Sequence, residues 1–283
     1  MTRNTRRRLL SHFVIVLCAM AVVIAVVPLA LVLLHVGRQG ISSVGVAFFT
    51  EMPRPVGETG GGMANALAGS LVVTLLGAAF AVPIGIMSGV YAAEYAGTRL
   101  ASATRFAADT LNGVPSIVIG VFVYSVAVLP FRRFSALAGG LALGVMMIPL
   151  IMRTTEELLR LVPSTLKEGA LALGATRGRA VFTVVVPAAL PGILTGILLA
   201  LARIAGETAP LLFTSLNNGF WSTDVRQPIS TLTVQIFTYA ISPYEEWHRL
   251  AWAGALVLVS MVLLCSLLAR FASARMERIQ RGG

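Results

Sequence analysis

The sequence predicts an all-α protein that crosses a membrane six times, and three features of its composition support this fold class. Hydrophobic residues make up 57% of the 283 residues, only 12% are charged, and the apolar residues fall into six long runs. An average soluble domain has about 25% charged residues, so this chain has too few charges to cover a water-exposed surface. A helix that crosses the hydrocarbon core needs about 20 apolar residues, and each run provides roughly that length.

The first run follows a cluster of arginines and could be a signal peptide or an anchor helix. It is longer than the apolar part of a signal peptide and no clear small-x-small cleavage site follows it, so the sequence favours an uncleaved anchor. In chain order the predicted spans are Leu9 to Leu34, Ala64 to Tyr91, Phe106 to Leu129, Ala136 to Met152, Val181 to Phe213 and Leu250 to Ala269.

Prolines predict irregular geometry in two of these spans. Pro115 removes a backbone donor and is expected to kink the third span. The fifth run is too long for one straight crossing, so its first part, through Pro191, is expected to form an elbow at the inner membrane surface.

The distribution of lysine and arginine predicts that both termini are cytoplasmic. With the N-terminus inside, the inner segments carry 15 of these residues and the outer segments carry 6. Cytoplasmic loops of membrane proteins are enriched in such residues, so the net charge of +10 reflects membrane topology rather than nucleic-acid binding. Arg132 and Arg133 go against this trend, because they lie in a very short outer turn.

The two longer outer segments are each expected to contain a short helix. One is predicted around Val44 to Phe49, and an amphipathic one is predicted over Pro228 to Phe237, with proline in its first turn. The predicted organisation is an anchor helix with its outer loop over 1–63, a transmembrane domain over 64–272 with a cytoplasmic loop at about 163–180, and a cytoplasmic tail over 273–283.

The inner loop between the fourth and fifth spans predicts a short amphipathic helix. Thr165 and Glu168 have the spacing of a capping box, and Gly174 is a plausible C-terminal stop. Leu166, Ala170 and Leu173 would lie on one face. A helix of about two turns is marginal alone, so it either lies on lipid headgroups or docks on a cytoplasmic partner.

The same loop resembles the Glu-Ala-Ala loop of bacterial ABC-importer permeases. The matching pattern is Glu168-Gly169-Ala170, three residues, Gly174, nine residues, and then Val184-Val185-Val186-Pro187. Gly169 replaces the usual first alanine, and valines replace the usual isoleucine and leucine. The resemblance implies a type I importer fold in the bacterial cytoplasmic (inner) membrane. It also implies that Glu168, Gly169, Ala170, Gly174 and Pro187 couple the chain to an ATPase subunit.

Three further segments are similar to the A-type membrane subunit of phosphate-importing ABC systems. They are Asn112 to Gly120, Met152 to Glu157 and Ala202 to Thr214. This resemblance implies a permease that carries inorganic phosphate and assembles with a homologous permease, two ATP-binding subunits and an extracytoplasmic phosphate-binding protein. Two alternatives stay open: a permease for another oxyanion such as sulfate or molybdate, and a secondary transporter that works without ATP, which would often show internal repeats.

The chain is not expected to be an enzyme by itself. It contains no Gly-x-x-x-x-Gly-Lys-Ser/Thr motif and no evident catalytic Ser/His/Asp set, and its three histidines are widely separated. No cofactor or metal site is therefore predicted on this chain, and ATP with its Mg²⁺ would be bound by the partner ATPase.

Arg203 and Glu207 are the leading candidates for the substrate pathway. They lie four residues apart and would share one face of a helix. An arginine near the bilayer centre costs about 3 kcal/mol on insertion scales, so it is expected to avoid lipid. A guanidinium suits phosphate because its planar fork meets two oxygens and its charge does not depend on pH. The alternatives are a buried pair that only fixes helix packing, or an arginine that snorkels to the surface.

Arg153, at the inner end of the fourth span, is a further candidate. It is either an ordinary snorkelling anchor or, by the family resemblance, a pathway residue. Glu156 and Glu157 are expected on a solvated helix face, and Asp109 is expected to pair with Arg105.

Overall fold

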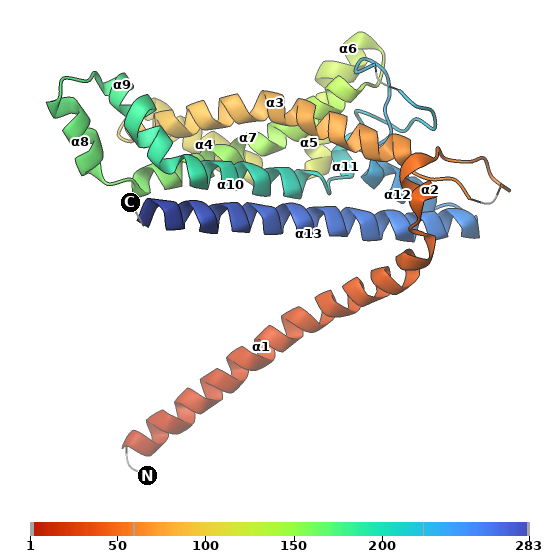
Figure 1. Cartoon of the computed structure of the whole chain (residues 1–283), viewed down its shortest axis with the longest axis horizontal. Coiled ribbons are helices and arrows are strands. Elements are labelled where there is room, and N and C mark those ends of the chain that lie inside the picture. Colours follow the sequence, from red (N-terminus) through yellow and green to blue (C-terminus); the bar gives the residue numbers. More distant parts are fainter. Residues whose placement is uncertain (1–2, 59, 223, 282–283) are drawn as a thin grey trace.

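The computed structural model describes residues 3–58, 60–222 and 224–281, and every regular element in these ranges is helical (Figure 1). Five helical segments are long and apolar enough to cross a membrane, and a bent pair of helices provides a sixth span if its two arms count as one. The long helices are α1 (Arg3–Gly40), α3 (Ala64–Glu94), α7 (Ala136–Leu161), α10 (Val186–Ile204) and α13 (Glu245–Arg281). The predicted all-α membrane fold is therefore confirmed.

The third predicted span is broken rather than kinked. Its first arm is α4 (Arg99–Gly113), and its second arm runs through α5 (Ser116–Val123), the π-helical turn η2 (Tyr124–Val128) and α6 (Leu129–Phe131). The helix direction bends by 105° between the two arms. The residue before a proline is disfavoured in helical conformation, and here Val114 is extended and precedes Pro115. The expected continuous helix over Phe106 to Leu129 was wrong in shape, although the position of the break was anticipated.

The fifth span is helical from Arg177 to Ile204. It consists of α9 (Arg177–Ala180), the π-helical turn η3 (Val181–Val185) and α10. Figure 1 shows α9 inclined to α10, so the expected elbow is a change of direction within a helical segment. Pro191 lies inside α10, beyond that bend. After α10 the chain breaks and forms the short α11 (Ala209–Leu212).

Both short helices predicted in the outer segments are present, but the second begins later than predicted. The helix α2 (Val46–Thr50) lies where a surface helix was expected. The helix α12 (Leu232–Ala240) begins after Thr231, so Pro228 lies outside it and not in its first turn as predicted. The predicted tail over 273–283 is helical as far as Arg281, and its last two residues lie outside the described ranges.

Small residues allow α3 and α7 to pack closely and form the centre of the bundle. A Cβ atom at Gly89 would lie 2.6 Å from the carbonyl oxygen of Met152, and one at Gly85 would lie 2.7 Å from Cβ of Ile151. Between membrane helices, such close backbone approach gives van der Waals contact that lipid cannot replace. This contact positions the α7 residues on which the candidate site depends.

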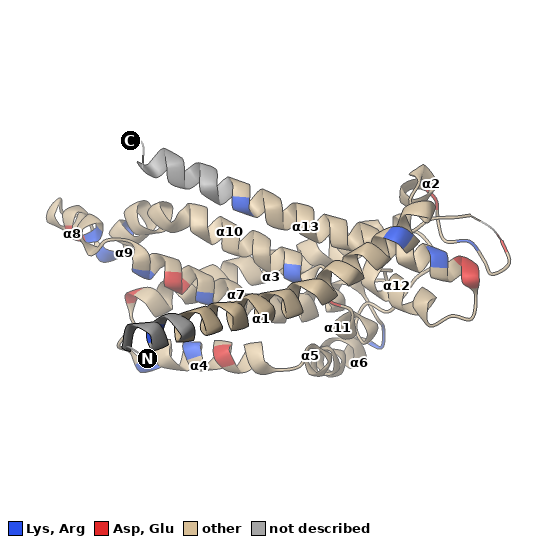
Figure 2. Cartoon of the chain, turned by 90° about the horizontal axis from the view of Figure 1, so that it is seen from below, with Lys and Arg blue, Asp and Glu red and all other residues tan. Residues whose placement is uncertain are grey.

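The bundle has two distinct ends, and α1 leaves it at one of them. Figure 1 shows α8 (Ser164–Ala172) and α9 at one end, and α2, α6 and α12 at the other. The first helix contacts α13 near its own C-terminal end, where Gly40 packs on Trp252, and then diverges from the bundle. Figure 2 shows Lys, Arg, Asp and Glu mainly toward the two ends and few along the middle of the long helices. These ends are named below the α8 end and the α12 end.

Candidate translocation groove and coupling helix

A groove runs between α7 and α10. Glycines on α10 bring the two helices together: a Cβ atom at Gly192 would lie 2.9 Å from the side chain of Leu158. Beside this contact lies a hollow of about 470 Å³. Its lining is Leu150, Thr154, Leu158, Gly192, Thr195, Gly196, Leu199, Ala200 and Arg203. A second hollow of about 480 Å³ shares Leu158 and Gly192 and extends toward α8. Together they form an apolar groove that contains one cation, Arg203.

Arg203 lies in the last turn of α10 and is exposed in this groove. In the part of the chain that the structure describes, its guanidinium forms no hydrogen bond and no ion pair. An arginine within a membrane rarely faces lipid without a polar partner. The exposed position of Arg203 therefore suits a pathway filled by water or by an anion.

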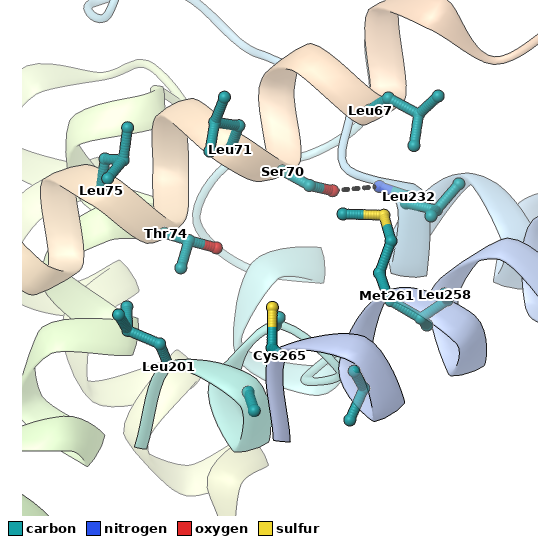
Figure 3. A pocket seen from close by; sticks show the side chains of 13 residues that line it. Leu67, Ser70, Leu71, Thr74, Leu75, Leu201, Leu232, Leu258, Met261 and Cys265 are labelled. Carbon is teal, nitrogen blue, oxygen red and sulfur yellow. Dashed lines mark hydrogen bonds between the residues drawn. The ribbon is translucent and has the colours of Figure 1, made fainter. Parts of the chain in front are cut away.

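The opposite face of α10 lines a hollow of different chemistry, which Figure 3 shows in close-up. This hollow measures about 200 Å³ and lies between α3, α10, α12 and α13. Its polar side chains are only Ser70, Thr74 and Cys265, and Ser70 Oγ already accepts the N–H of Leu232 at 2.7 Å. It contains no charged side chain, so it does not suit an anion.

Glu207 does not share a helix face with Arg203, and this prediction was wrong. The helix α10 ends at Ile204, and Gly206 lies in the turn that follows. The N–H of Glu207 donates to the carbonyl of Ile204 at 3.0 Å. The chain thus leaves the helix before it reaches Glu207, four residues after Arg203. In the described ranges no ion pair joins the two side chains. The carbonyl of Glu207 instead accepts Thr233 Oγ1 at 2.9 Å, which ties this break to α12.

Arg153 is held by two carboxylates on α4 and α7. Its Nε donates to Asp109 Oδ1 at 2.9 Å, a second nitrogen donates to Asp109 Oδ2, and Nη1 donates to Glu156 Oε2 at 3.3 Å. The expected pair of Asp109 with Arg105 does not form, because Asp109 points across to α7. A side chain fixed by two helices differs from a freely snorkelling anchor.

Glu156 is the centre of this charged cluster, and its expected place on a solvated face was wrong. It is only 2% exposed. It accepts Arg105 Nε at 2.5 Å and Arg160 Nη2 at 2.6 Å in addition to Arg153. Arg105 also donates to the carbonyl of Ala92, at 2.6 Å. The cluster thus joins the end of α3 to α4 and α7. Its three guanidinium groups compensate the cost of removing the Glu156 carboxylate from water.

The loop between the fourth and fifth predicted spans forms the protruding helix α8. The predicted capping box is absent. Thr165 lies inside α8, the N-cap residue of the helix is Pro163, and no side chain caps the first turn. The predicted stop at Gly174 is confirmed. Its φ is +85°, its N–H donates to Leu171 at 2.9 Å, and the N–H of Ala175 donates to Ala170 at 3.1 Å. This is the Schellman arrangement, in which a left-handed glycine satisfies the last helix carbonyls.

The surface of α8 is largely uncovered. Glu168 and Gly169 are exposed, Ala170 is half-buried, and Leu173 is 91% exposed. Pro187 is exposed in the first turn of α10. The helix rests on η3, and its Lys167 forms an ion pair with Glu94 at the end of α3. Glu168, Gly169 and Ala170 therefore lie on the projecting helix α8 with Gly174 just beyond its end, whereas Pro187 lies in α10.

Comparisons with known proteins agree with this architecture. The family described as "Binding-protein-dependent transport system inner membrane component" matches residues 81–278. The phosphate transport system permease protein PstA of Yersinia pestis is 47% identical over 270 residues, which cover 95% of this chain and 92% of that protein. PstA of Haemophilus influenzae is 44% identical over 246 residues, which cover 87% of this chain and 86% of that protein.

Solved structures support the fold at lower identity. The structure titled "Crystal structure of an amino acid ABC transporter with histidines" aligns with a TM-score of 0.55 and 18% identity, over 74% of this chain and 92% of that chain. An inward-facing structure of the MetNI methionine ABC transporter aligns with a TM-score of 0.54 and 20% identity, over 76% of this chain and 92% of that chain. The chain therefore belongs to the binding-protein-dependent transport system inner membrane components, among the permeases related to PstA.

Proposed function

We propose that this chain is the membrane permease subunit of an ATP-driven importer of inorganic phosphate. The relationship to PstA proteins supports the substrate. The observation that carries the proposal is Arg203 in the groove between α7 and α10, where its guanidinium has no ion pair among the described residues. A homologous permease would cover this groove and complete the pathway within the membrane lipid. Two ATPase subunits would bind ATP and Mg²⁺, and an extracytoplasmic binding protein would deliver phosphate. Nucleic acid has no part in this function.

The chemistry of the groove suits a transient anion site. The fork of Arg203 can donate two parallel hydrogen bonds to two phosphate oxygens. The apolar groove walls lower the local dielectric constant and strengthen this attraction. Glu207, in the break just after α10, stays a candidate pathway residue, although it forms no ion pair with Arg203 within the described residues. Arg153 would act further along the pathway, toward the α8 end, and its charge is already partly neutralised by Asp109 and Glu156.

The exposed helix α8 suits a docking role. Leu173, just after α8, and the exposed apolar residues of α8 would enter a cleft of an ATPase subunit. Glu168, Gly169, Ala170, Gly174 and Pro187 would lie in or beside the contact. Lys167 and the apolar contact of α8 with η3 would carry the movement of α8 into α3 and α10. An ATP-independent transporter has no need for such a helix.

Arg203→Gln tests the pathway role. In the assembled importer we expect phosphate uptake to fall by about 10- to 100-fold, because a hydrogen bond to a charged group contributes about 1.5–3 kcal/mol. Arg38→Gln is the matched control, since Arg38 is an exposed arginine at the end of α1, outside the groove. Uptake of radiolabelled phosphate and the amount of assembled complex are measured together. Normal uptake by Arg203→Gln would refute the pathway role.

Substrate competition separates phosphate from other oxyanions. The wild-type importer is given labelled phosphate with an excess of unlabelled phosphate, sulfate or molybdate. We expect only unlabelled phosphate to suppress uptake. Suppression by sulfate or molybdate at equal excess would favour the alternative substrate.

A further inference from the structure

Two arginines from separate loops share a hollow at the α12 end. Arg133 follows α6, and Arg226 precedes α12. They line an open hollow of about 400 Å³ together with Phe131, Leu137, Leu141 and Ser135. Arg133 belongs to the outer turn that goes against the distribution of basic residues in this chain, and the proposed translocation chemistry does not use it.

The backbone holds both arginines in place. Arg132 has a left-handed φ of 50°, and the N–H of Arg133 donates to the carbonyl of Val128 at 3.3 Å, which turns the chain back toward α7. The segment around Arg226 pairs with the first turn of α7: the N–H of Leu137 donates to the carbonyl of Val225 at 3.0 Å. The two arginines therefore start from a fixed backbone, so a ligand would have to order only their side chains.

Neither guanidinium is neutralised within the described residues. Arg133 and Arg226 are exposed, and no hydrogen bond or ion pair of their side chains is found there. Asp224 is the nearest acidic residue in sequence, and its Oδ1 accepts the backbone N–H of Arg226 at 2.9 Å. Two like charges beside an apolar wall repel each other, and the attraction of an anion bound in the shared hollow would offset that repulsion.

We propose that this hollow receives an acidic side chain of the extracytoplasmic binding protein. The proposal rests on the proposed function: if α8 docks on an ATPase subunit, the α8 end is cytoplasmic and the opposite α12 end faces the outside. A carboxylate fits because guanidinium groups bind it in a bidentate manner, while Phe131, Leu137 and Leu141 contact the apolar stem of the acidic side chain. The hollow shares no lining residue with the groove of Arg203, so the two sites can be tested by separate substitutions.

Such a contact would act mainly on association. Charges at the rim of an interface steer the encounter and set its register, and their effect decreases as salt rises. Arg133→Gln combined with Arg226→Gln should therefore lower the association rate constant of the binding protein by about 3- to 30-fold at low salt. The salt dependence of this rate constant should also become shallower.

The experiment uses the assembled importer in lipid nanodiscs and a fluorescently labelled, phosphate-loaded binding protein. Association is followed by stopped-flow at several salt concentrations. Arg38→Gln combined with Arg132→Gln is the matched control, because it also removes two positive charges from exposed residues, and neither residue lines the hollow. Arg133→Lys combined with Arg226→Lys keeps the charge and should retain most of the rate. Equal rates for the two double glutamine variants would overturn the proposal.

Two further outcomes have defined meanings. Unchanged docking of the double glutamine variant of Arg133 and Arg226, with a raised KM for phosphate uptake at saturating binding protein, would overturn the proposal in favour of a free-phosphate site. The complex with Arg203→Gln should dock the binding protein at the wild-type rate. If the wild-type complex itself does not dock a phosphate-loaded binding protein, the proposed function fails, and this inference fails with it.

Discussion

At the scale of single residues, Glu156 shows how a membrane protein can bury a carboxylate. Its two oxygens accept hydrogen bonds from Arg105, Arg153 and Arg160, which come from α4 and α7. The group sits where α3, α4 and α7 meet, so its charge organises the packing of these helices rather than facing solvent. Removal of one partner of a buried ion pair leaves a buried charge without compensation. The resulting loss of stability exceeds the net contribution that the intact pair makes to stability.

Glu156→Gln should destabilise the bundle. The change leaves three guanidinium groups around a neutral amide, and we expect a loss of about 3–5 kcal/mol in the free energy of unfolding. Arg160→Gln is the control, because the Arg160 side chain is 52% exposed, and an exposed ion pair contributes about 0–1 kcal/mol. Thermal unfolding in detergent, followed by light scattering and tryptophan fluorescence, gives the comparison. A smaller effect of Glu156→Gln than of Arg160→Gln would contradict the central role of Glu156.

At the scale of elements, α8 depends on how its C-terminal end is closed. Its first turn has no side-chain cap, so the Schellman closure at Gly174 is the local feature that ends the helix. With Leu173 almost fully exposed, the helix has little packing of its own to hold its shape. Backbone geometry at one glycine therefore controls how the proposed docking surface is presented.

Gly174→Val should weaken docking of the ATPase subunit. A left-handed backbone costs a non-glycine residue about 1–2 kcal/mol, and a β-branched side chain resists it most. Gly178→Val is the matched control, because a Cβ atom there meets nothing within 4 Å and its φ is not positive. The ATPase-to-permease ratio after co-purification should fall for Gly174→Val and stay near the wild-type value for Gly178→Val. Equal ratios for both variants, with normal uptake, would argue against the docking role of α8.

At the scale of the whole molecule, the two ends of the bundle carry different chemistry. The α8 end presents the protruding helix and the cluster around Glu156, and the α12 end presents the Arg133 and Arg226 hollow. Figure 1 shows the start of α1 and the end of α13 toward the α8 end, which agrees with an even number of crossings. The proposed orientation places the α8 end in the cytoplasm, where ATP is available.

Cysteine labelling tests this orientation. In a variant in which Cys18 and Cys265 are replaced, we expect an impermeant thiol reagent to label Arg132→Cys and Ser222→Cys in intact cells, but not Thr176→Cys. All three positions are exposed or partly exposed, so accessibility to the reagent depends on the side of the membrane. Labelling after cell lysis confirms that Thr176→Cys is reactive. Labelling of Thr176→Cys from outside would invert the topology and remove the docking argument.

The sequence by itself determined the features that depend on local properties of the chain. The apolar runs located the long helices because a bilayer requires about 20 apolar residues per crossing. Gly174 located the end of α8, because a left-handed backbone favours glycine whatever surrounds it. The motif around Glu168 indicated the family because it records a spacing along the chain, and the family match later confirmed it.

Only the tertiary structure decided which side chains meet. Asp109 pairs with Arg153 rather than with its neighbour Arg105, since the contact of α4 with α7 brings residues 44 positions apart together. Glu156 is buried because α3, α4 and α7 converge on it, which spacing along one helix does not reveal. Glu207 separates from Arg203 because the chain leaves the helix one residue after Arg203. Partner choice depends on helix packing and chain direction, and these are properties of the folded bundle rather than of any local segment.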